Sequence, residues 1–421
     1  MKTIPVYGID FGTTNSAIAI LEGGRPRILP VDRGPTMRSV LFFPEHDVET
    51  FVGNQAIEEY VNRGMEGRFL QSLKSILPST WFTTTRIREM EYEVEDLVAL
   101  ILRNLKIRAD AMVGMDVRRV VLGRPAYFAM DSALETLAVE RLITAAQRAG
   151  FEEVRLQIEP IAAAFFYEMD LAGAETVMVA DLGGGTSDFT VMRLAPNRRD
   201  DSDRGADILG TSGVRIAGDS FDAAVMRAKL LRHFGQGVRY ESHPGKWLQL
   251  PSHLLGDLCE WSKIPFLKNN YYREFLDQVR WGADDPAAIA RLQALIDQDL
   301  GFFLFHSIET AKCELSDLES TVIHFHELSV WLDEPITRDE FNHVIDEEMQ
   351  LIEDCVDDLL QSVGLAADEI DTVFMTGGSS LVPRVRWLLQ KRFGADRLRR
   401  GDTFLSVASG LAMNARLFQW Q

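Results

Sequence analysis

Apolar runs separated by glycine-rich turns occur in the same arrangement at two distant places in the chain. Residues 6–20 (VYGIDFGTTNSAIAI) and residues 177–191 (VMVADLGGGTSDFTV) each contain an apolar run that ends in aspartate, a short turn of glycine and hydroxyl residues, and a second apolar run. This pattern predicts a strand, a hairpin turn and a second strand. Asp10 matches Asp181 with an offset of 171 residues, so the chain contains an internal repeat.

Each copy of the repeat is followed by a further strand and helix pattern. Residues 119–123 (RVVLG) predict a strand ahead of an amphipathic helix from about Ser132 to Ala149. Residues 372–376 (TVFMT) predict a strand ahead of a helix that begins near Val382. Duplicated units of this kind predict two α/β lobes that face each other, with the equivalent turns meeting at a cleft.

Several segments lie outside this repeat. Residues 36–91 predict a smaller appended subdomain. Within it, residues 69–77 predict an amphipathic helix. Residues 197–204 (NRRDDSDR) are typical of a mobile polar loop. Residues 235–300, rich in aromatic side chains, predict a helical insertion, and residues 299–315 predict one further helix.

Composition narrows the class of protein. A chain of 421 residues fits two or three folding units, and its net charge of −19 argues against nucleic acid or an anionic membrane surface as a partner. Cys259, Cys313 and Cys355 have no paired spacing, which indicates a reducing compartment. The sequence shows neither a signal peptide nor an apolar run of about 18 residues, so we expect a cytoplasmic protein.

The glycine turns are suited to binding phosphate. Their small residues expose backbone N–H groups, and neighbouring threonines add hydroxyl donors. Asp10 and Asp181 stand at equivalent strand ends and would repel each other unless a cation lay between them, a role that Mg²⁺ fills with carboxylates, phosphates and retained waters. A third turn at residues 376–380 (TGGSS) precedes a helix, where an anion or a nucleoside can lie against backbone donors. One such turn alone is often an ordinary turn, but matched copies favour the phosphate interpretation.

Three further polar features each allow two interpretations. Lys74 lies on a predicted amphipathic helix, where it either reaches a ligand or belongs to the solvated face. Glu159 either faces the cleft or favours the N-terminus of the helix that follows it. Glu309, Lys312 and Ser316 are spaced to share one face of a helix, which is either its solvated side or a set of hydrogen-bonding groups for a ribose and a base edge.

Together these motifs resemble the actin-like ATPases, and among them the nucleotide-binding domain of DnaK-type heat-shock chaperones, the heat-shock protein 70 family, in its stand-alone YegD-like group. The matching motifs run in the family's order along the chain: YGIDFGTTNSAIAI, FVGNQAI, PAYF, IEPIAAAFFY, VMVADLGGGTSDFTV, GDSFD, IETAKCELS and TVFMTGGSSLVP. The resemblance implies an α/β actin-like ATPase fold of two duplicated lobes with mixed sheets flanked by helices, plus two smaller inserted subdomains. The implied bounds are 1–172 and 403–421 for lobe I, with an insert at about 34–104, and 173–402 for lobe II, with an insert at about 219–319.

The resemblance also implies roles for individual residues. The catalytic set is Lys74, Glu159, Asp181, Thr186 and Asp10. The residues implied to bind ATP or ADP are Gly12, Thr13, Thr14, Asn15, Gly183, Gly184, Gly185, Asp188, Gly218, Glu309, Lys312, Ser316, Gly377, Gly378 and Ser379. Asp10 and Asp181 are implied to hold Mg²⁺ through water, and K⁺ is a further candidate cation. Pro125 matches the proline that helps to relay the nucleotide state in this family.

The chain departs from the family pattern at several places. Cys313 and Leu381 stand where the family usually has two arginines that sandwich the adenine, so we expect weaker binding of the base. Gly123 and Arg124 replace the usual residues before the relay proline. The insertion at about 235–300 enlarges the region that exchange factors grip in the family. Because the sequence ends directly after its last helix, we expect no peptide-binding domain.

These features predict an ATP-binding, slowly ATP-hydrolysing, chaperone-like molecular switch. Its expected partners are the nucleotide and a protein client or co-chaperone, with no nucleic acid and no membrane. Two alternatives stay open: a small-molecule kinase of the same superfamily, and a nucleotide-binding scaffold or filament protein. A product assay with candidate acceptors tests the first alternative, and light scattering with Mg-ATP tests the second.

Overall fold

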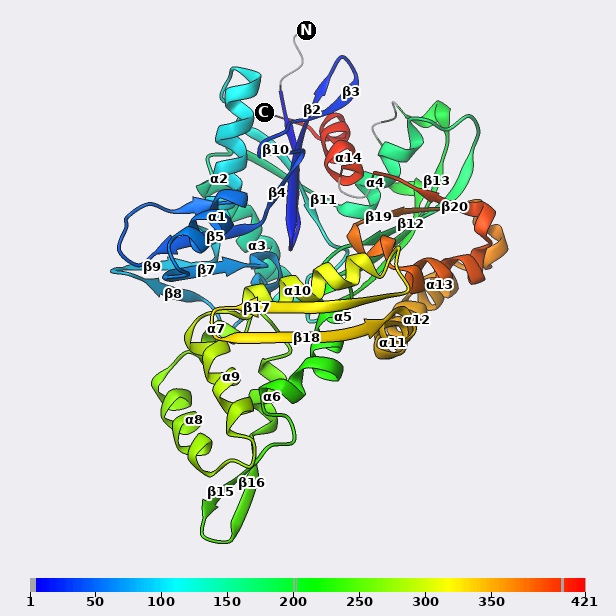
Figure 1. Cartoon of the computed structure of the whole chain (residues 1–421). Helices are drawn as coiled ribbons and strands as arrows, with labels where there is room; N and C mark the ends of the chain where they lie inside the picture. Colours follow the sequence, from blue (N-terminus) through cyan, green and yellow to red (C-terminus); the bar gives the residue numbers. More distant parts are fainter. Residues whose placement is uncertain (1–4, 200, 202, 403–404, 421) are drawn as a thin grey trace. The chain divides into compact units, whose positions relative to one another are not determined.

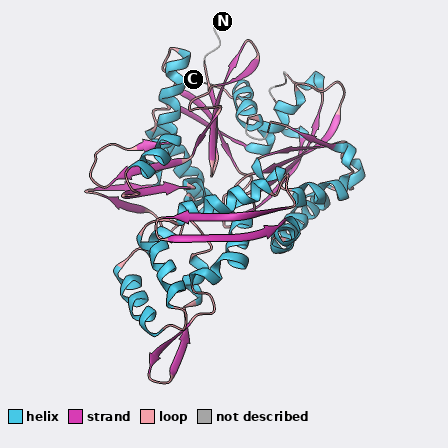
Figure 2. Ribbon diagram, viewed as in Figure 1, coloured by secondary structure: helices cyan, strands magenta, loops and turns pink. Residues whose placement is uncertain are grey.

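The computed structural model describes residues 5–199, 201, 203–402 and 405–420 (Figures 1 and 2). The chain forms two compact units. Unit 1 comprises Met1–Gly218, Leu351–Ser380 and Val385–Gln421, and unit 2 comprises Asp219–Gln350 and Leu381–Arg384. Unit 2 begins where the second inserted subdomain was predicted to begin but continues past its predicted end near residue 319. The finer division into lobes and inserts stays a prediction.

Unit 1 is built on two mixed β-sheets. The first has the order β11-β10-β1-β2-β3, with β4 also paired to β2. Its strands are β1 (Tyr7–Phe11), β2 (Asn15–Glu22), β3 (Arg25–Ile28), β4 (Thr36–Arg38), β10 (Arg119–Arg124) and β11 (Glu153–Ile158). The second has the order β14-β13-β12-β19-β20. Its strands are β12 (Glu175–Leu182), β13 (Ser187–Leu194), β14 (Ile208–Val214), β19 (Thr372–Thr376) and β20 (Leu398–Arg400).

The two sheets have the same topology. In each, the first strand of the repeat pairs antiparallel with the strand after its glycine turn, β1 with β2 and β12 with β13. The same first strand pairs parallel with a later strand, β1 with β10 and β12 with β19, and a further parallel strand follows in both sheets. The predicted repeat and the predicted α/β class with mixed sheets are therefore confirmed.

Helices cover both faces of the first sheet. Helices α2 (Val94–Val113) and α3 (Ser132–Arg148) share a core with the side chains of Tyr7, Ile9 and Phe11. Helix α14 (Ser406–Asn414) packs on the opposite face of β1, so closely that a Cβ on Gly8 would lie 2.2 Å from the backbone nitrogen of Ala412. Strand residues alternate between faces, so Asp10 lies on the same side of the sheet as Gly8.

Helix α4 (Glu159–Glu168) packs against the second sheet and against α14. Its alanines share a core with Val177 and Val179 of β12. A Cβ on Gly410 of α14 would lie 1.8 Å from the carbonyl oxygen of Ala162, so glycine permits this close helix contact. Asp181 has the same parity along β12 as Val177 and Val179, which places it on the α4 side. Both repeat aspartates therefore lie on the faces that carry the α4 and α14 pair.

Unit 1 also contains the segment predicted as a smaller appended subdomain, residues 36–91. Besides β4, this segment forms β5 (Val40–Pro44), β6 (Phe51–Val52), α1 (Asn54–Asn62), β7 (Gly67–Gln71), β8 (Thr84–Ile87) and β9 (Met90–Glu93). The order β6-β5-β7 forms a small sheet, and β8 pairs with β9. Helices α12 (Asp346–Val363) and α13 (Pro383–Phe393) each begin in unit 2 and continue into unit 1.

One local expectation for unit 1 was wrong. Residues 69–77 do not form one helix, because β7 ends at Gln71 and a single 3₁₀ turn, Leu73–Ile76, follows Ser72 in a left-handed conformation. The mobile polar loop predicted at 197–204 stays a prediction; at its end, the buried guanidinium of Arg204 donates hydrogen bonds to Glu168 and Asp207. Asp200 and Ser202 of that loop lie outside the described residues.

Unit 2 is mainly helical with two hairpins. Its elements are α5 (Gly218–Val225), β15 (Arg239–His243), β16 (Lys246–Gln249), α6 (Ser252–Asp257), α7 (Ile264–Leu267), α8 (Asn270–Gly282), α9 (Pro286–Asp297), α10 (Gly301–Glu314), β17 (Ser320–Glu327), β18 (Val330–Thr337) and α11 (Arg338–Val344). The predicted insertion at about 235–300 is helical as expected, except for the β15–β16 hairpin. Across the part of the chain that the structure describes, none of the helices has the length and apolarity needed to cross a bilayer.

Candidate functional site

The two glycine turns of the repeat touch each other inside unit 1. A Cβ on Gly185 would lie 3.1 Å from the side-chain oxygen of Thr13, although the two residues are far apart in sequence. Each turn is also tightly closed. A Cβ on Gly12 would lie 2.2 Å from the carbonyl oxygen of Asn15, and the Gly183 N–H donates to the Thr186 carbonyl at 2.9 Å. A larger residue at Gly12 would therefore disrupt the backbone of the first turn.

The third glycine turn buttresses the second one. Gly377 has φ of +80°, and a Cβ there would lie 2.2 Å from the carbonyl oxygen of Leu182. The Ser379 hydroxyl donates to the Gly183 carbonyl at 2.7 Å, and the Gly218 N–H donates to the same oxygen at 3.4 Å. Three segments predicted to bind nucleotide are thus gathered at the Gly183 carbonyl.

Lys74 lies in the interior of unit 1 and forms an ion pair with Glu159. The distance from its Nζ to Glu159 Oε1 is 2.6 Å, and the two residues are 8% and 5% exposed. Lys74 is therefore not part of a solvated face, and Glu159 does more than favour a helix end. Gly123 makes room for this contact, since a Cβ there would lie 2.9 Å from Glu159 Oε1.

Three aspartates surround this ion pair. Burial raises the pKa of Asp10 to about 7, and the charge of Glu159 adds to the effect while Lys74 opposes it. Burial also raises the pKa of Asp181 well above its ordinary value, with Glu159, Asp10 and Asp188 contributing further. The carboxylates at the ends of β1 and β12 therefore lie close enough to affect each other's charge and that of Glu159, at the start of α4.

Asp188 completes the group of carboxylates. Burial raises its pKa to about 7, against the opposing effect of a hydrogen bond from the Thr186 side chain. Its Oδ1 accepts the Ala126 N–H at 2.7 Å, and a Cβ on Gly213 would lie 2.5 Å from the same oxygen. Ala126, Gly123 and Gly213 are not among the site residues that the sequence predicts. Each is a small residue, which allows a carboxylate to approach the backbone.

The charge balance of this group favours a cation. Asp10, Glu159, Asp181 and Asp188 are four carboxylates, whereas Lys74 is the cation that interacts with all four. Burial penalises Lys74 as well, but Glu159, Asp10 and Asp181 outweigh that penalty and raise its pKa. Buried carboxylates with raised pKa values are stabilised in their charged form by a nearby cation. Mg²⁺ suits this position beside the glycine turns, because it commonly binds carboxylates, waters and substrate phosphates together. The residues present therefore fit the implied Mg-nucleotide.

A second lysine and carboxylate pair lies in unit 2. Lys312, on the last turn of α10, donates from Nζ to Asp222 Oδ2 at 2.8 Å. Burial raises the pKa of Asp222 to about 7 and that of Asp219 to about 6, while Lys312 opposes both shifts. Asp222 Oδ1 is buried without a hydrogen-bond partner. Asp219 and Asp222 belong to the GDSFD motif, in which the sequence predicts a role only for Gly218; their spacing along α5 is the signal that places both beside Lys312.

The other predicted site residues are distributed between the two units. Ser316 lies two residues beyond the end of α10, so it extends rather than shares the helix face of Glu309 and Lys312, all within unit 2. Thr14 and Gly184 lie in the first two turns, and Gly378 begins the 3₁₀ turn after β19. The Thr14 carbonyl accepts the Ser39 N–H at 2.9 Å.

Comparison with known proteins gives two findings. The family model described as Hsp70 protein matches residues 77–242 and 298–420 of this chain. Its unmatched stretch between these ranges, residues 243–297, falls within the insertion predicted at about 235–300. The Chaperone protein DnaK of Elusimicrobium minutum (strain Pei191) is 28% identical over 422 residues, an alignment that covers 97% of this chain and 57% of that relative. The chain thus spans little more than half the length of the curated relative it matches.

Proposed function

The chain belongs to the Hsp70 protein family, and from that premise we propose that it binds ATP with Mg²⁺, hydrolyses it slowly and acts as a nucleotide-controlled switch. Members of this family are ATPases. The observation that carries the proposal is the contact between the Thr13 and Gly185 turns beside a buried lysine and four carboxylates. The matched relative is named a chaperone, but the alignment covers 57% of that relative, so chaperone activity itself is not carried over to this chain.

The glycine turns are proposed to bind the phosphates. The backbone donors of Gly12 to Asn15 and of Gly184 to Thr186 belong to turns that already contact each other, so one triphosphate can engage both. Thr13 and Thr186 add hydroxyl donors, and Ser379 holds the carbonyl of Gly183 in place. This arrangement positions the phosphates before any reaction begins.

Lys74 is proposed to bind the γ-phosphate and the attacking water. Its raised pKa keeps the ammonium group charged at neutral pH, and Glu159 fixes its direction. Positive charge fixed at this position stabilises the charge that develops on the phosphoryl oxygens during transfer to water. The chain's own groups position the phosphates and neutralise their charge, but none acts as a strong base toward the attacking water. We therefore expect slow turnover.

Asp10 and Asp181 are proposed to hold Mg²⁺ through water, with Asp188 and Glu159 ordering the water around it; K⁺ is a further candidate cation. When bound, the metal ion would supply neutralisation of the phosphate and carboxylate charges. Asp188 also connects the site to the strand end at Pro125, because its carboxylate accepts the N–H of Ala126. A change in the charge near Asp188 would therefore alter its hydrogen bond with Ala126, which lies in the connection between β10 and α3.

Residues of unit 2 are proposed to recognise the nucleoside. Glu309, Lys312 and Ser316 supply carboxylate, ammonium and hydroxyl groups suited to ribose hydroxyls and a base edge. Gly378 and Ser379 are proposed to contribute from the third turn. The molecule that senses the switch is proposed to be a protein client or co-chaperone.

Calorimetry of the full chain with ATP and ADP, with and without Mg²⁺, tests the proposal together with phosphate release. We expect Mg-dependent nucleotide binding and slow hydrolysis in the wild type, and loss of both in Asp181→Ala. The matched control is Asp170→Ala, an exposed aspartate at the end of α4 in the same unit. Wild-type binding and hydrolysis in Asp181→Ala would contradict the site, as would phosphate transfer to an organic acceptor in preference to water.

A further inference from the structure

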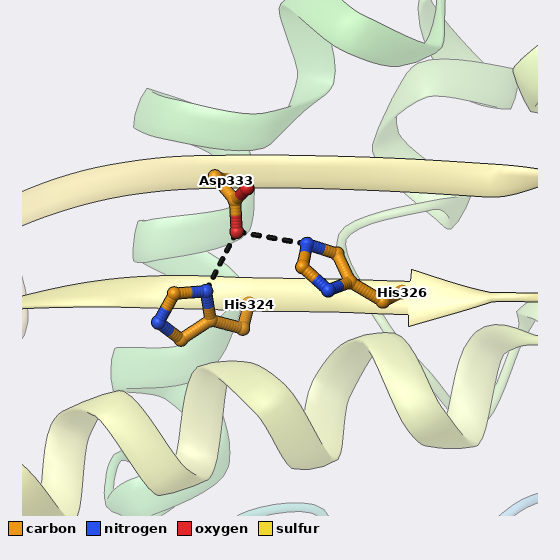
Figure 3. Close-up of side chains that lie close together, drawn as sticks. All are labelled: His324, His326 and Asp333. Atoms are coloured by element: carbon orange, nitrogen blue, oxygen red, sulfur yellow. Dashed lines mark hydrogen bonds and ion pairs between the residues drawn. The ribbon is translucent and has the colours of Figure 1, made fainter.

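The β17–β18 hairpin of unit 2 carries a polar cluster on its exposed face. Side chains along β18 alternate strictly between buried and exposed, and the buried face of the hairpin includes Phe325 and Leu332. The opposite face carries His324 and His326 of β17 and Asp333 of β18, all three exposed (Figure 3). The strand period of two therefore places both histidines on the same side.

Both imidazole rings converge on one carboxylate oxygen. His324 Nδ1 lies 2.6 Å from Asp333 Oδ1, and His326 Nε2 lies 2.9 Å from the same atom. His324 pairs directly across the hairpin with Asp333, whereas His326 pairs with Trp331. The Trp331 ring stacks on the His326 ring, with centroids 4.8 Å apart and planes at 15°. That stacking holds the His326 ring in the orientation that points Nε2 at Asp333.

We propose that His324, His326 and Asp333 form a binding site for a divalent transition-metal ion of the Zn²⁺ class. Two imidazoles and one carboxylate are preferred ligands for such ions, and they leave a fourth position for water. The three potential donor atoms all lie within 4.8 Å of one another. A tetrahedral Zn²⁺ at about 2 Å from each ligand separates them by roughly 3.3 Å. Small rotations of these exposed side chains would admit the ion.

The geometry of the cluster differs from that of an ordinary contact between a histidine and an aspartate. His343 and Asp346 offer a useful contrast within the same unit. They form a single contact of 3.3 Å between an exposed histidine and an aspartate, without a second imidazole. The convergence of two rings on one oxygen distinguishes the hairpin cluster from such an ordinary surface pair.

Among the described residues, β17 and β18 form a sheet of two strands only. A bound metal ion would cross-link these two strands. A ligand that binds only the folded state stabilises that state by mass action. The site is built without any residue proposed to contact ATP, so its loading should not depend on the nucleotide. Mg²⁺ should not compete for it, because Mg²⁺ prefers oxygen ligands.

Titration of the untagged, chelator-treated full chain with ZnCl₂ tests the proposal. Calorimetry should give about one Zn²⁺ per chain in this site, and NMR should show ring-proton shifts at His324 and His326. His326→Asn and Asp333→Asn should each weaken that binding at least tenfold. His343→Asn is the matched control and should bind as the wild type does. All titrations are repeated in a Cys313→Ser background, which removes an exposed thiol that could bind Zn²⁺ on its own.

Circular dichroism and urea unfolding show whether each variant is folded. If folded His326→Asn and Asp333→Asn proteins bind Zn²⁺ as tightly as the wild type, the hairpin is not the site and the proposal is overturned. Absence of any Zn²⁺-dependent shift in the His324 and His326 rings overturns it equally. Failure of the nucleotide proposal would leave these Zn²⁺ results unchanged, so the two ideas are tested separately.

Discussion

Lys74 of unit 1 and Lys312 of unit 2 make a natural comparison. Each is largely buried and pairs with one carboxylate, Glu159 at 2.6 Å and Asp222 at 2.8 Å. In both groups the acidic side chains outnumber the lysine, and burial raises the pKa of several of them. Two of the nine lysines in the chain therefore have similar immediate partners.

The two lysines differ in what surrounds the ion pair. Lys74 has carboxylates from the ends of two sheets around it, in the same unit as three glycine turns that touch one another. Lys312 has carboxylates on the helices α5 and α10, including Asp222 with one unpartnered buried oxygen. The first arrangement suits phosphate and a hydrated cation, while the second suits hydrogen bonds to hydroxyl groups. The ion pair alone therefore does not determine which ligand each group can bind. The neighbouring backbone and the balance of charges determine it.

Lys74→Ala should produce the largest difference between the two groups. We expect nucleotide binding to persist and the hydrolysis rate to fall roughly 100-fold, because one fixed charge aimed at the reacting phosphate is lost. Single-turnover hydrolysis with matched calorimetry measures both quantities. Lys391→Ala, an exposed lysine that lies over the Trp387 ring, is the control and should retain wild-type rates. An unchanged rate in Lys74→Ala would show that this ion pair is structural.

Asp10→Asn should reveal the acidic crowding around Lys74. With its pKa near 7, Asp10 binds a proton in the folded state that the unfolded chain releases, so stability falls as pH rises from about 4 to about 7. Asparagine cannot titrate. We therefore compare the unfolding free energies of the nucleotide-free wild type and Asp10→Asn between about pH 5 and pH 8. Over this range the wild type should lose about 2 kcal/mol relative to the variant. One pKa unit corresponds to about 1.4 kcal/mol, and the effect is smaller than for an isolated group because the carboxylates share protons.

Urea unfolding of both proteins across this pH range measures the difference. Asp170→Asn serves as the control because Asp170 is exposed, and it should follow the wild-type curve. A constant difference between wild type and Asp10→Asn at every pH would mean that the carboxylates do not interact as described.

Lys312→Met tests the other half of the comparison. The variant keeps most of the side-chain volume but removes the charge, so we expect ATP affinity to fall about tenfold through loss of a charged hydrogen bond. Mg-tripolyphosphate has no nucleoside, and its affinity should be unchanged. Competition calorimetry with both ligands separates the two contributions. A parallel loss of tripolyphosphate affinity would show that Lys312 acts on phosphates or on folding instead.

Much of this arrangement could be predicted from the sequence, because the repeat encodes it. The motifs around Asp10 and Asp181 gave both hairpins and the matched sheet topology, since apolar alternation and glycine turns are local signals. The surroundings of Lys74 could not be predicted in the same way. Its segment has helical periodicity, but pairing of β7 with β5 overrides that preference. The backbone partner of Asp188, Ala126, depends on tertiary contacts that leave no local pattern.

Cys313→Arg should give the smallest effect and sharpen the description of the nucleoside group. The resemblance places Cys313 where related proteins use an arginine against the adenine, and Cys313 is exposed on α10 one residue after Lys312. A guanidinium stacked on an aromatic ring contributes about 0.5–2 kcal/mol, so ATP affinity should rise severalfold. Calorimetry of wild type and variant with ATP measures the gain, and tripolyphosphate again supplies the control ligand. If both ligands gain equally, the added charge acts through the phosphates. A gain confined to ATP would locate the base beside α10 and assign the Lys312 group to nucleoside recognition.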